Sequence, residues 1–514
     1  MARGNQYKPN PPMNDQLVAG IHKFYRQGFH DKKILESLLE GNYYDSKKYG
    51  LGLRRFRGMR EKLGLIRSRK AGLGVDDIRP AMSVLREIYP RAGMRDMKRL
   101  LMEEHNLAVT RSVLSEYFLL YEPHLIRARR SQRFRRKRFW AAGVMDMLCC
   151  DQHDKWKRFG LRLHTAIDPF IGKIHWIKIW YTNSHPVLIA SYFLDDAEES
   201  GSIPLITQSD PGSENFGIAK AQTFLRHWHD PTMEGHLCHR WMKEKKNIPP
   251  EISWSQLRRR FTPGFENILD KGVHMGWYNI DDTVHRLTFR WTFIPWLQFE
   301  LDAYRSRVNS SAKRRNRNKI LPHGVPDHMA EFPHLYGALD FKVQIEREAI
   351  TEARALYAPP SHDVFNLVPT SFETTITRGY TSLGSPAIDR NNVWAIYCDL
   401  VKYIYADMEA KDIRTSWEDE LEAAEAAEAA QTMLPEPEVG DLLPLIDTGD
   451  RPDGSFYLGG VNRGAGLGAE HHAQLDEMVD ADEPRVEMED LWVEGPQPIC
   501  VMFSEDEDDF DDFE

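Results

Sequence analysis

Three carboxylate residues, Asp151, Asp210 and Glu251, stand where they could act together. Asp151 ends the apolar run VMDMLCCD, Asp210 ends the strand-like run SIPLITQSD, and Glu251 opens the helix-like run PPEISWSQLRRRF. Oxygen ligands of this kind suit Mg²⁺ or Mn²⁺, and two such ions about 3.5 to 4 Å apart can activate an attacking oxygen and stabilise a leaving one at phosphorus. The set therefore predicts a two-ion centre for phosphoryl transfer, although each carboxylate taken singly is more often a cap or a surface residue.

The three carboxylates can meet only if the chain brings two strand ends and one helix start together. From about residue 144 to 269 the sequence reads as three consecutive strands, a helix, a fourth strand and further helices. This order predicts an α/β domain with a mixed sheet, in which strand ends often carry catalytic carboxylates. If the first and fourth strands lie side by side, Asp151, Asp210 and the first turn at Glu251 converge on one point.

The settings of these carboxylates resemble a known family. The segments CCDQHDKWKRFGLRLHTAIDPF, TQSDPGSENF and PEISWSQLRRRF are similar to the core of retroviral integrases and DDE transposases, specifically the integrase core domain proteins of eukaryotic, notably fungal, genomes. The resemblance implies an RNase H-like fold, with Asp151, Asp210 and Glu251 as catalytic residues that hold two Mg²⁺ or Mn²⁺ ions. It also implies DNA strand cleavage followed by strand transfer, as in DNA integration by a transposable element.

Charge is distributed unevenly along the chain, whose net charge is −10. Residues 1 to 140 hold 31 basic and 14 acidic side chains, and residues 415 to 514 hold 3 basic and 30 acidic ones. A basic front half predicts a polyanion partner such as DNA, and an acidic end predicts a solvated or interacting arm. We expect the acidic arm to bind a protein partner or to fold back on the basic region and compete with DNA.

Two basic segments precede the carboxylates. Residues 1 to 70 show helical spacing with glycines at the breaks, which indicates three short helices, the third being basic. They are compatible with a helix-turn-helix unit facing DNA, or equally with a small helical bundle that has a solvated basic face. Residues 127 to 140, RARRSQRFRRKRFW, combine charge with aromatic rings, as a segment that tracks nucleic acid needs, although a nuclear-import signal is an alternative.

Further basic residues flank Glu251. Arg258 and Arg259 follow it by seven and eight residues, two helical turns on, and so can point along the same face. We expect DNA contacts from the basic residues Arg54, Arg55, Arg57, Arg133, Arg135, Arg136, Lys137, Arg138, Lys243, Lys245, Lys246, Arg258 and Arg259, each of which is by itself more often a solvated charge.

The chain divides into five predicted parts. They are a helix-turn-helix-like domain (1–70), a second helical, basic DNA-binding lead-in (75–140), an RNase H-like integrase core (144–275), a helical extension (276–410) and an acidic, largely disordered tail (411–514). The five cysteines form an odd set without regular spacing, which favours neither a disulfide framework nor a zinc ribbon. No apolar run of about 18 residues is present, so we expect a nuclear protein without a membrane contact.

These features predict a DNA integrase or transposase, with DNA as substrate and a homo-oligomer as the working form. Two alternatives stay open. A host-retained protein with the same fold could bind DNA or chromatin without cutting it, and an RNase H-like nuclease could use the same metal chemistry with water as the only acceptor.

Overall fold

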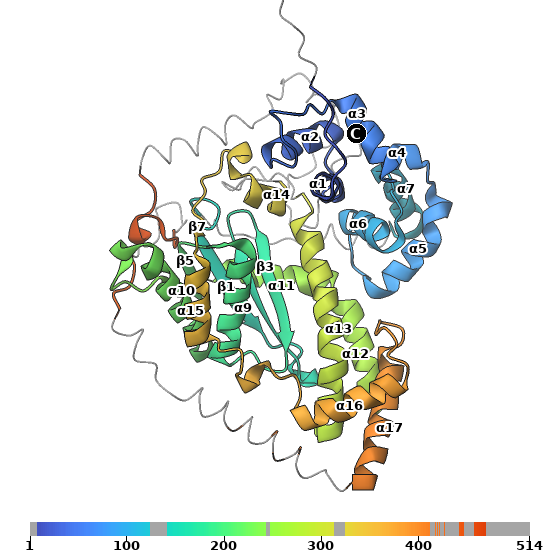
Figure 1. The fold of residues 1–514 in the computed structure, drawn as a ribbon. Coiled ribbons are helices and arrows are strands. Elements are labelled where there is room, and N and C mark those ends of the chain that lie inside the picture. Colours follow the sequence, from blue (N-terminus) through green and yellow to red (C-terminus); the bar gives the residue numbers. More distant parts are fainter. Residues whose placement is uncertain are drawn as a thin grey trace, which may run out of the picture.

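The computed structural model describes residues 8–123, 141–242, 247–312 and 324–411, four isolated positions between 417 and 426, and residues 442–446 and 457–468. At its centre lies a mixed sheet of five strands flanked by helices, as the sequence predicts for an α/β core (Figure 1). The strands follow the spatial order β3-β2-β1-β5-β6. Their bounds are β1 (Met147–His153), β2 (Arg162–Asp168), β3 (Lys173–Trp180), β5 (Ile206–Ser209) and β6 (His239–Trp241).

Both pairing directions occur in this sheet. β1, β2 and β3 form an antiparallel meander, because short turns join them. β5 runs parallel to β1, and β6 runs parallel to β5, which leaves β6 at one edge. The predicted neighbourhood of the first strand and the Asp210 strand is therefore confirmed.

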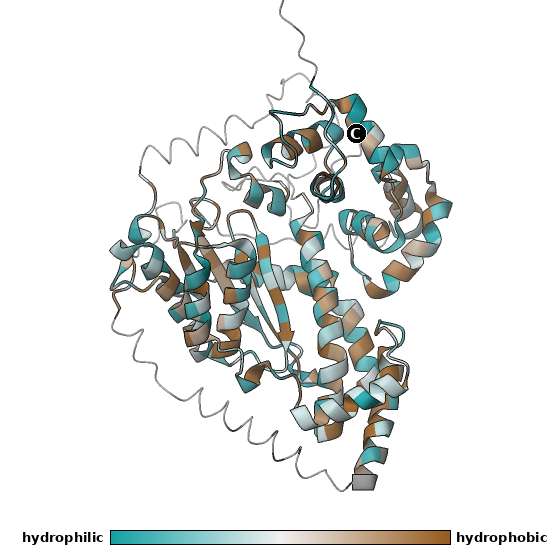
Figure 2. Cartoon of the chain, in the orientation of Figure 1, coloured by the Kyte–Doolittle hydropathy of each residue, from teal (hydrophilic) through white to brown (hydrophobic). Residues whose placement is uncertain are grey.

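Helices cover both faces of the sheet (Figure 1). One face carries α9 (Pro186–Ser200), α10 (Phe216–His229) and α15 (Arg347–Tyr357), and the other carries α11 (Ile248–Arg260), α12 (Thr262–His274) and α13 (Thr283–Asn309). Figure 2 shows hydrophobic and hydrophilic residues mixed along these helices.

The remaining helices pack on this core. Their bounds are α1 (Asp15–Arg26), α2 (Asp31–Glu40), α3 (Leu53–Lys62), α4 (Ser68–Ala71), α5 (Val75–Ile88), α6 (Met94–His105), α7 (Arg111–Tyr121), α14 (Pro326–Glu331), α16 (Thr370–Ser382) and α17 (Val393–Lys411). Short 3₁₀ turns occur at Lys157–Phe159, Ser213–Asn215, Pro231–Met233, Pro333–Tyr336, Asp363–Phe365 and Val461–Gly464. The helices expected in residues 1 to 120 are thus present.

The two N-terminal helical groups have different neighbours. Helices α1 to α3 share a small core with Phe332, which follows α14. Helices α5 to α7 join the larger core beside α12, where Gly264 lies so close to α5 that a Cβ atom would stand 1.6 Å from the Ile88 carbonyl oxygen. The second group is therefore packed tightly against the side of the molecule that carries α11.

Two predicted strand limits are wrong. The run SIPLITQSD is not one strand, because Pro204 has no N–H to donate and interrupts the ladder. Ser202–Ile203 forms β4, which pairs with β7 (Val343–Gln344) in a separate two-stranded sheet, and β5 begins at Ile206. The first strand also continues past Asp151 to His153, because its antiparallel pairing with β2 continues after its pairing with β5 has ended.

Part of the acidic tail departs from the predicted disorder. Residues 442–446 and 457–468 have a defined structure and pack against the edge of the sheet that carries β6. The rest of the predicted disordered region after residue 426 lies outside the described residues. Within the described stretches of the chain, none of the helices has both the length and the hydrophobicity needed to cross a bilayer.

Candidate active site

Asp151 and Asp210 lie at the same end of two neighbouring parallel strands. The register of β1 and β5 pairs Cys149 with Gln208, and each aspartate comes two residues after its member of this pair. Asp151 is partly buried within β1, whereas Asp210 follows the last residue of β5 and is exposed. The parallel pairing, rather than any local feature, brings together two carboxylates that are 59 residues apart.

Asn247 fastens the start of α11 to both of these strands. Its side-chain Nδ2 donates to the Cys150 carbonyl oxygen over 2.7 Å, and its Oδ1 accepts from Gln208 Nε2 over 3.3 Å. The side chain is buried, so these bonds replace contacts with water that it has lost. Helix α11 then begins at Ile248, with Pro249 and Pro250 in its first turn as predicted.

One face of the first part of α11 points toward Asp151. Glu251, Trp254 and Arg258 share this face, since they are three and four residues apart. Trp254 Nε1 donates to Asp151 Oδ2 over 2.9 Å, and the Trp254 ring stacks on His153 with 4.7 Å between ring centroids. Glu251 lies one turn before Trp254 with its side chain exposed. The helix therefore presents Glu251 toward the edge where both aspartates lie.

Electrostatics link the three predicted carboxylates. Burial, together with the negative charges of Asp210 and Glu251, raises the pKa of the Asp151 carboxyl to about 7, although the Trp254 hydrogen bond acts in the opposite direction. Loss of hydration also raises the pKa of Asp210 above its ordinary value. The surroundings of Asp151 thus disfavour its ionised form, and a cation bound beside it would stabilise that form.

A fourth carboxylate, Glu214, lies beside this group and was missed by the sequence reasoning. Its side chain accepts hydrogen bonds from Gln152 of β1 and from Asn215, whose Nδ2 also donates to the Asp210 carbonyl oxygen over 3.1 Å. Burial raises the pKa of Glu214, and the charge of Asp210 contributes. The glycine at 212 makes room for it, because a Cβ there would stand 2.1 Å from the carboxylate. Its position four residues after Asp210 was the available signal.

The donor chemistry of Asp151, Asp210 and Glu251 suits a divalent cation, because all three offer hard oxygen ligands. In the described part of the chain, however, no three His, Cys, Asp or Glu side chains are close enough together to hold a metal ion. The two aspartates are aligned by the sheet, whereas Glu251 is exposed on helix α11. Their role as metal ligands stays a prediction.

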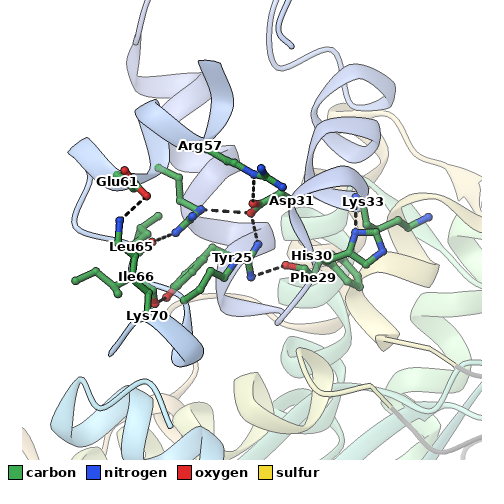
Figure 3. Close-up of polar contacts among 12 residues, drawn as sticks. Tyr25, Phe29, His30, Asp31, Lys33, Arg57, Glu61, Leu65, Ile66 and Lys70 are labelled. Carbon is green, nitrogen blue, oxygen red and sulfur yellow. Dashed lines mark hydrogen bonds and ion pairs between the residues drawn. The ribbon is translucent and has the colours of Figure 1, made fainter. Parts of the chain in front are cut away.

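The predicted DNA-binding arginines of α3 differ in their surroundings. Arg54 and Arg55 are exposed, whereas Arg57 donates from Nε to Asp31 Oδ2 over 3.2 Å (Figure 3). Asp31 also pairs with Arg60 and Arg67. Arg57 therefore helps to hold α2 and α3 together, and Arg54 and Arg55 are the members of the set that face solvent without a described ion-pair partner.

The remaining basic residues divide into two groups. Arg258 is exposed on α11, and its charge contributes to lowering the pKa of His153, while Arg259 is partly buried. The others lie outside the described residues, namely Arg133, Arg135, Arg136, Lys137, Arg138, Lys243, Lys245 and Lys246. DNA contact by any of these residues stays a prediction.

Comparison with known proteins gives one match. Residues 142–325 match a family described as integrase core domain, a range that runs from just before β1 to the start of α14. No curated protein and no solved structure matches the chain.

Proposed function

We propose that this protein cleaves DNA strands and joins the freed ends to target DNA. The match of residues 142–325 to the integrase core domain family supports an integrase-like or transposase-like function on DNA. Asp151, Asp210 and Glu251 would be the catalytic residues. Asn247 and Trp254 would be positioning residues: Asn247 bonds to both strands, and Trp254 bonds to Asp151.

One observation carries this proposal. Asp151 and Asp210 stand on adjacent parallel strands at the same end of the sheet, and the helix that bears Glu251 is bonded to Asp151 itself through Trp254. The raised pKa of Asp151 means that ionising this buried carboxyl lowers the stability of the folded protein. Stability alone would therefore not favour an aspartate at this position. This cost in stability supports a functional role for Asp151.

Divalent cations are part of the proposal, with Asp151, Asp210 and Glu251 as the residues that would hold them. Bound there, Mg²⁺ or Mn²⁺ would supply Lewis-acid activation at phosphorus and neutralise charge in the transition state. The chain itself would place the DNA backbone at this edge of the sheet. Arg258 is suited to a phosphate contact, because it lies on the same face of α11 as Glu251 and is exposed.

The test uses a labelled DNA duplex, taken from the DNA that flanks the coding sequence, together with supercoiled plasmid and Mg²⁺ or Mn²⁺. Products longer than the duplex would report joining, shortened products alone would report a nuclease, and binding without either would report a DNA-binding protein. We expect joined products that disappear in Asp210→Asn. Unchanged joining by that variant would remove Asp210 from the proposed site.

A second candidate is a DNA-binding protein that keeps the integrase fold without cutting. The observation that favours it is the basic N-terminal part of the chain, where Arg54 and Arg55 of α3 are exposed and could contact DNA without the three carboxylates. The variant Asp151→Asn distinguishes the two candidates. If the protein is an enzyme, the variant loses DNA joining. If the protein only binds DNA, the wild type does not join DNA, and the variant binds DNA as well or slightly better, because one negative charge is lost.

A further inference from the structure

Residues 442–446 and 457–468, here called the tail strap, add to the free edge of the sheet. The amide of Leu443 donates to the Gly235 carbonyl oxygen, and the amide of Leu237 donates to the Leu443 carbonyl oxygen, each over 2.9 Å. Both partners lie in the stretch that leads into β6, which has no other strand on that side in the five-stranded sheet. The strap thus covers backbone groups at the edge of the sheet that would otherwise be open to another chain.

A buried carboxylate ties the strap to the start of β1. Asp146 is fully buried and accepts from the Ala142 amide, the Tyr457 hydroxyl and the Gly460 amide, each over 2.9 Å. Two of these three donors belong to the strap. Without the strap, Asp146 would retain the Ala142 amide alone among the donors in the described residues, and an underbonded buried carboxylate is costly. Burial already raises the pKa of Asp146 to about 6.

The approach of the strap depends on two consecutive glycines. A Cβ atom on Gly459 would stand 2.2 Å from an Asp146 oxygen, and one on Gly460 would stand 2.6 Å from the Leu205 Cβ. Any larger residue would therefore force the strap away from Asp146 and from the start of β5. Glycine at both positions indicates a fitted contact rather than a chance association of a polar tail.

The strap also contributes apolar side chains to the core beneath the sheet. Leu445, Tyr457 and Val461 are buried in one cluster with Met147 of β1 and Ile206 of β5. Met147 and Ile206 are the first residues of their strands, whereas Asp151 and Asp210 lie toward the other ends. These three strap side chains therefore pack near the starts of β1 and β5, whereas Leu442 of the strap packs in the cluster with Trp241, which pairs with Ser209 beside Asp210.

From these contacts we propose that the tail strap is an internal brace of the core: it docks in cis on the base of β1 and β5 and on the β6 edge, and it maintains the alignment of these strands. The brace also links β6 to the tail, since Arg240 donates to the Ile446 carbonyl oxygen over 3.0 Å.

Two leucines of the strap provide a matched test in the full-length chain. The Leu445 side chain is 7% exposed, and the Leu443 side chain, two residues earlier, is 61% exposed. Hydrogen exchange followed by mass spectrometry should show slow exchange at Leu443, Gly460 and Val461, whose amides donate to protein acceptors. We expect Leu445→Ala to speed this exchange at least tenfold and Leu443→Ala to leave it within about twofold of the wild type.

Truncation tests the brace separately. A chain that ends after residue 468 keeps the strap and loses most of the acidic arm, whereas a chain that ends after residue 441 loses both. We expect the melting temperature to fall in the chain that ends after residue 441 and to stay unchanged in the chain that ends after residue 468. Tyr457→Phe in the full chain should lower the melting temperature by less than truncation after residue 441 does. Unprotected strap amides in the wild type, or equal melting temperatures for all these proteins, would overturn the proposal. No DNA is needed for these measurements, so their outcome is independent of the proposed function.

Discussion

Replacing Asp151 by asparagine should stabilise the protein at alkaline pH while removing its activity. The ordinary pKa of an aspartate is 3.8, and burial with two negative neighbours raises that of Asp151 to about 7. The folded state therefore binds a proton more tightly than the unfolded state. Stability that is present below about pH 4 is lost as the pH rises toward 7, because the buried carboxyl must then ionise. Asparagine does not ionise, and its side-chain oxygen can still accept from Trp254.

The size of the effect follows from the shift. Three pKa units correspond to about 4 kcal/mol at about 1.4 kcal/mol per unit, which is an upper limit because local relaxation lowers the cost of ionisation. We expect Asp151→Asn to gain about 2 kcal/mol over the wild type at pH 8 and less than about 1 kcal/mol at pH 5. The assay is thermal unfolding of both proteins with EDTA from pH 5 to pH 8, together with a strand-transfer assay in Mg²⁺.

Asp154→Asn is the matched control, because it removes one exposed carboxylate three residues away. Its stability relative to the wild type should change little over the same pH range. The reasoning would be refuted if Asp151→Asn were less stable than the wild type at pH 8, or if its advantage did not depend on pH. Either result would mean that ionised Asp151 is well compensated in the absence of a cation.

Three further changes test other parts of the structure. Trp254→Phe keeps an aromatic ring but removes the donor to Asp151, so strand transfer should fall about tenfold with a small change in melting temperature. Asp31→Asn should destabilise the α1 to α3 unit by about 1 to 2 kcal/mol at pH 7. Burial acts against it, but the hydrogen bond and charge of Arg67 lower the pKa of Asp31 below its ordinary value of 3.8, so the effect of the substitution should shrink as the pH falls below 3.8. Gly264→Ala should lower the free energy of unfolding by about 2 kcal/mol or more, because its Cβ would clash with the Ile88 carbonyl oxygen. Denaturant unfolding measures this change.

Each of these changes has a control in the same chain. Trp228→Phe removes the indole donor of an exposed tryptophan and should leave strand transfer unchanged. Arg54→Ala should weaken DNA binding without lowering stability, in contrast to Asp31→Asn. Gly58→Ala lies in a helix with open space around it and should stabilise by about 0.5 kcal/mol. Equal effects of a test variant and its control would contradict the corresponding contact.

Periodicity predicted much of the core, because β1, β2 and β3 are apolar runs between turn residues. The mistakes have local causes. Pro204 split a run that otherwise reads as one strand, and β1 extends past Asp151 because of pairing with β2, which no property of the residues after Asp151 announces. The apolar stretches LLPLI and YLGGV within the acidic tail were the available signal for the strap, and total charge concealed them.

The sequence by itself determined the residue types of the candidate site, the α/β character of the core and the positions of Asp151, Asp210 and Glu251 on two strands and a helix. Only the tertiary structure decided how these parts are held: the alignment of β1 with β5, the Asn247 bonds to both strands, the Trp254 bond to Asp151 and the burial of Asp146 under Tyr457. These contacts join residues that are between 39 and 311 positions apart in the chain. Propensity and periodicity act over a few residues along the chain, whereas such contacts depend on how whole elements pack, so no local pattern records them.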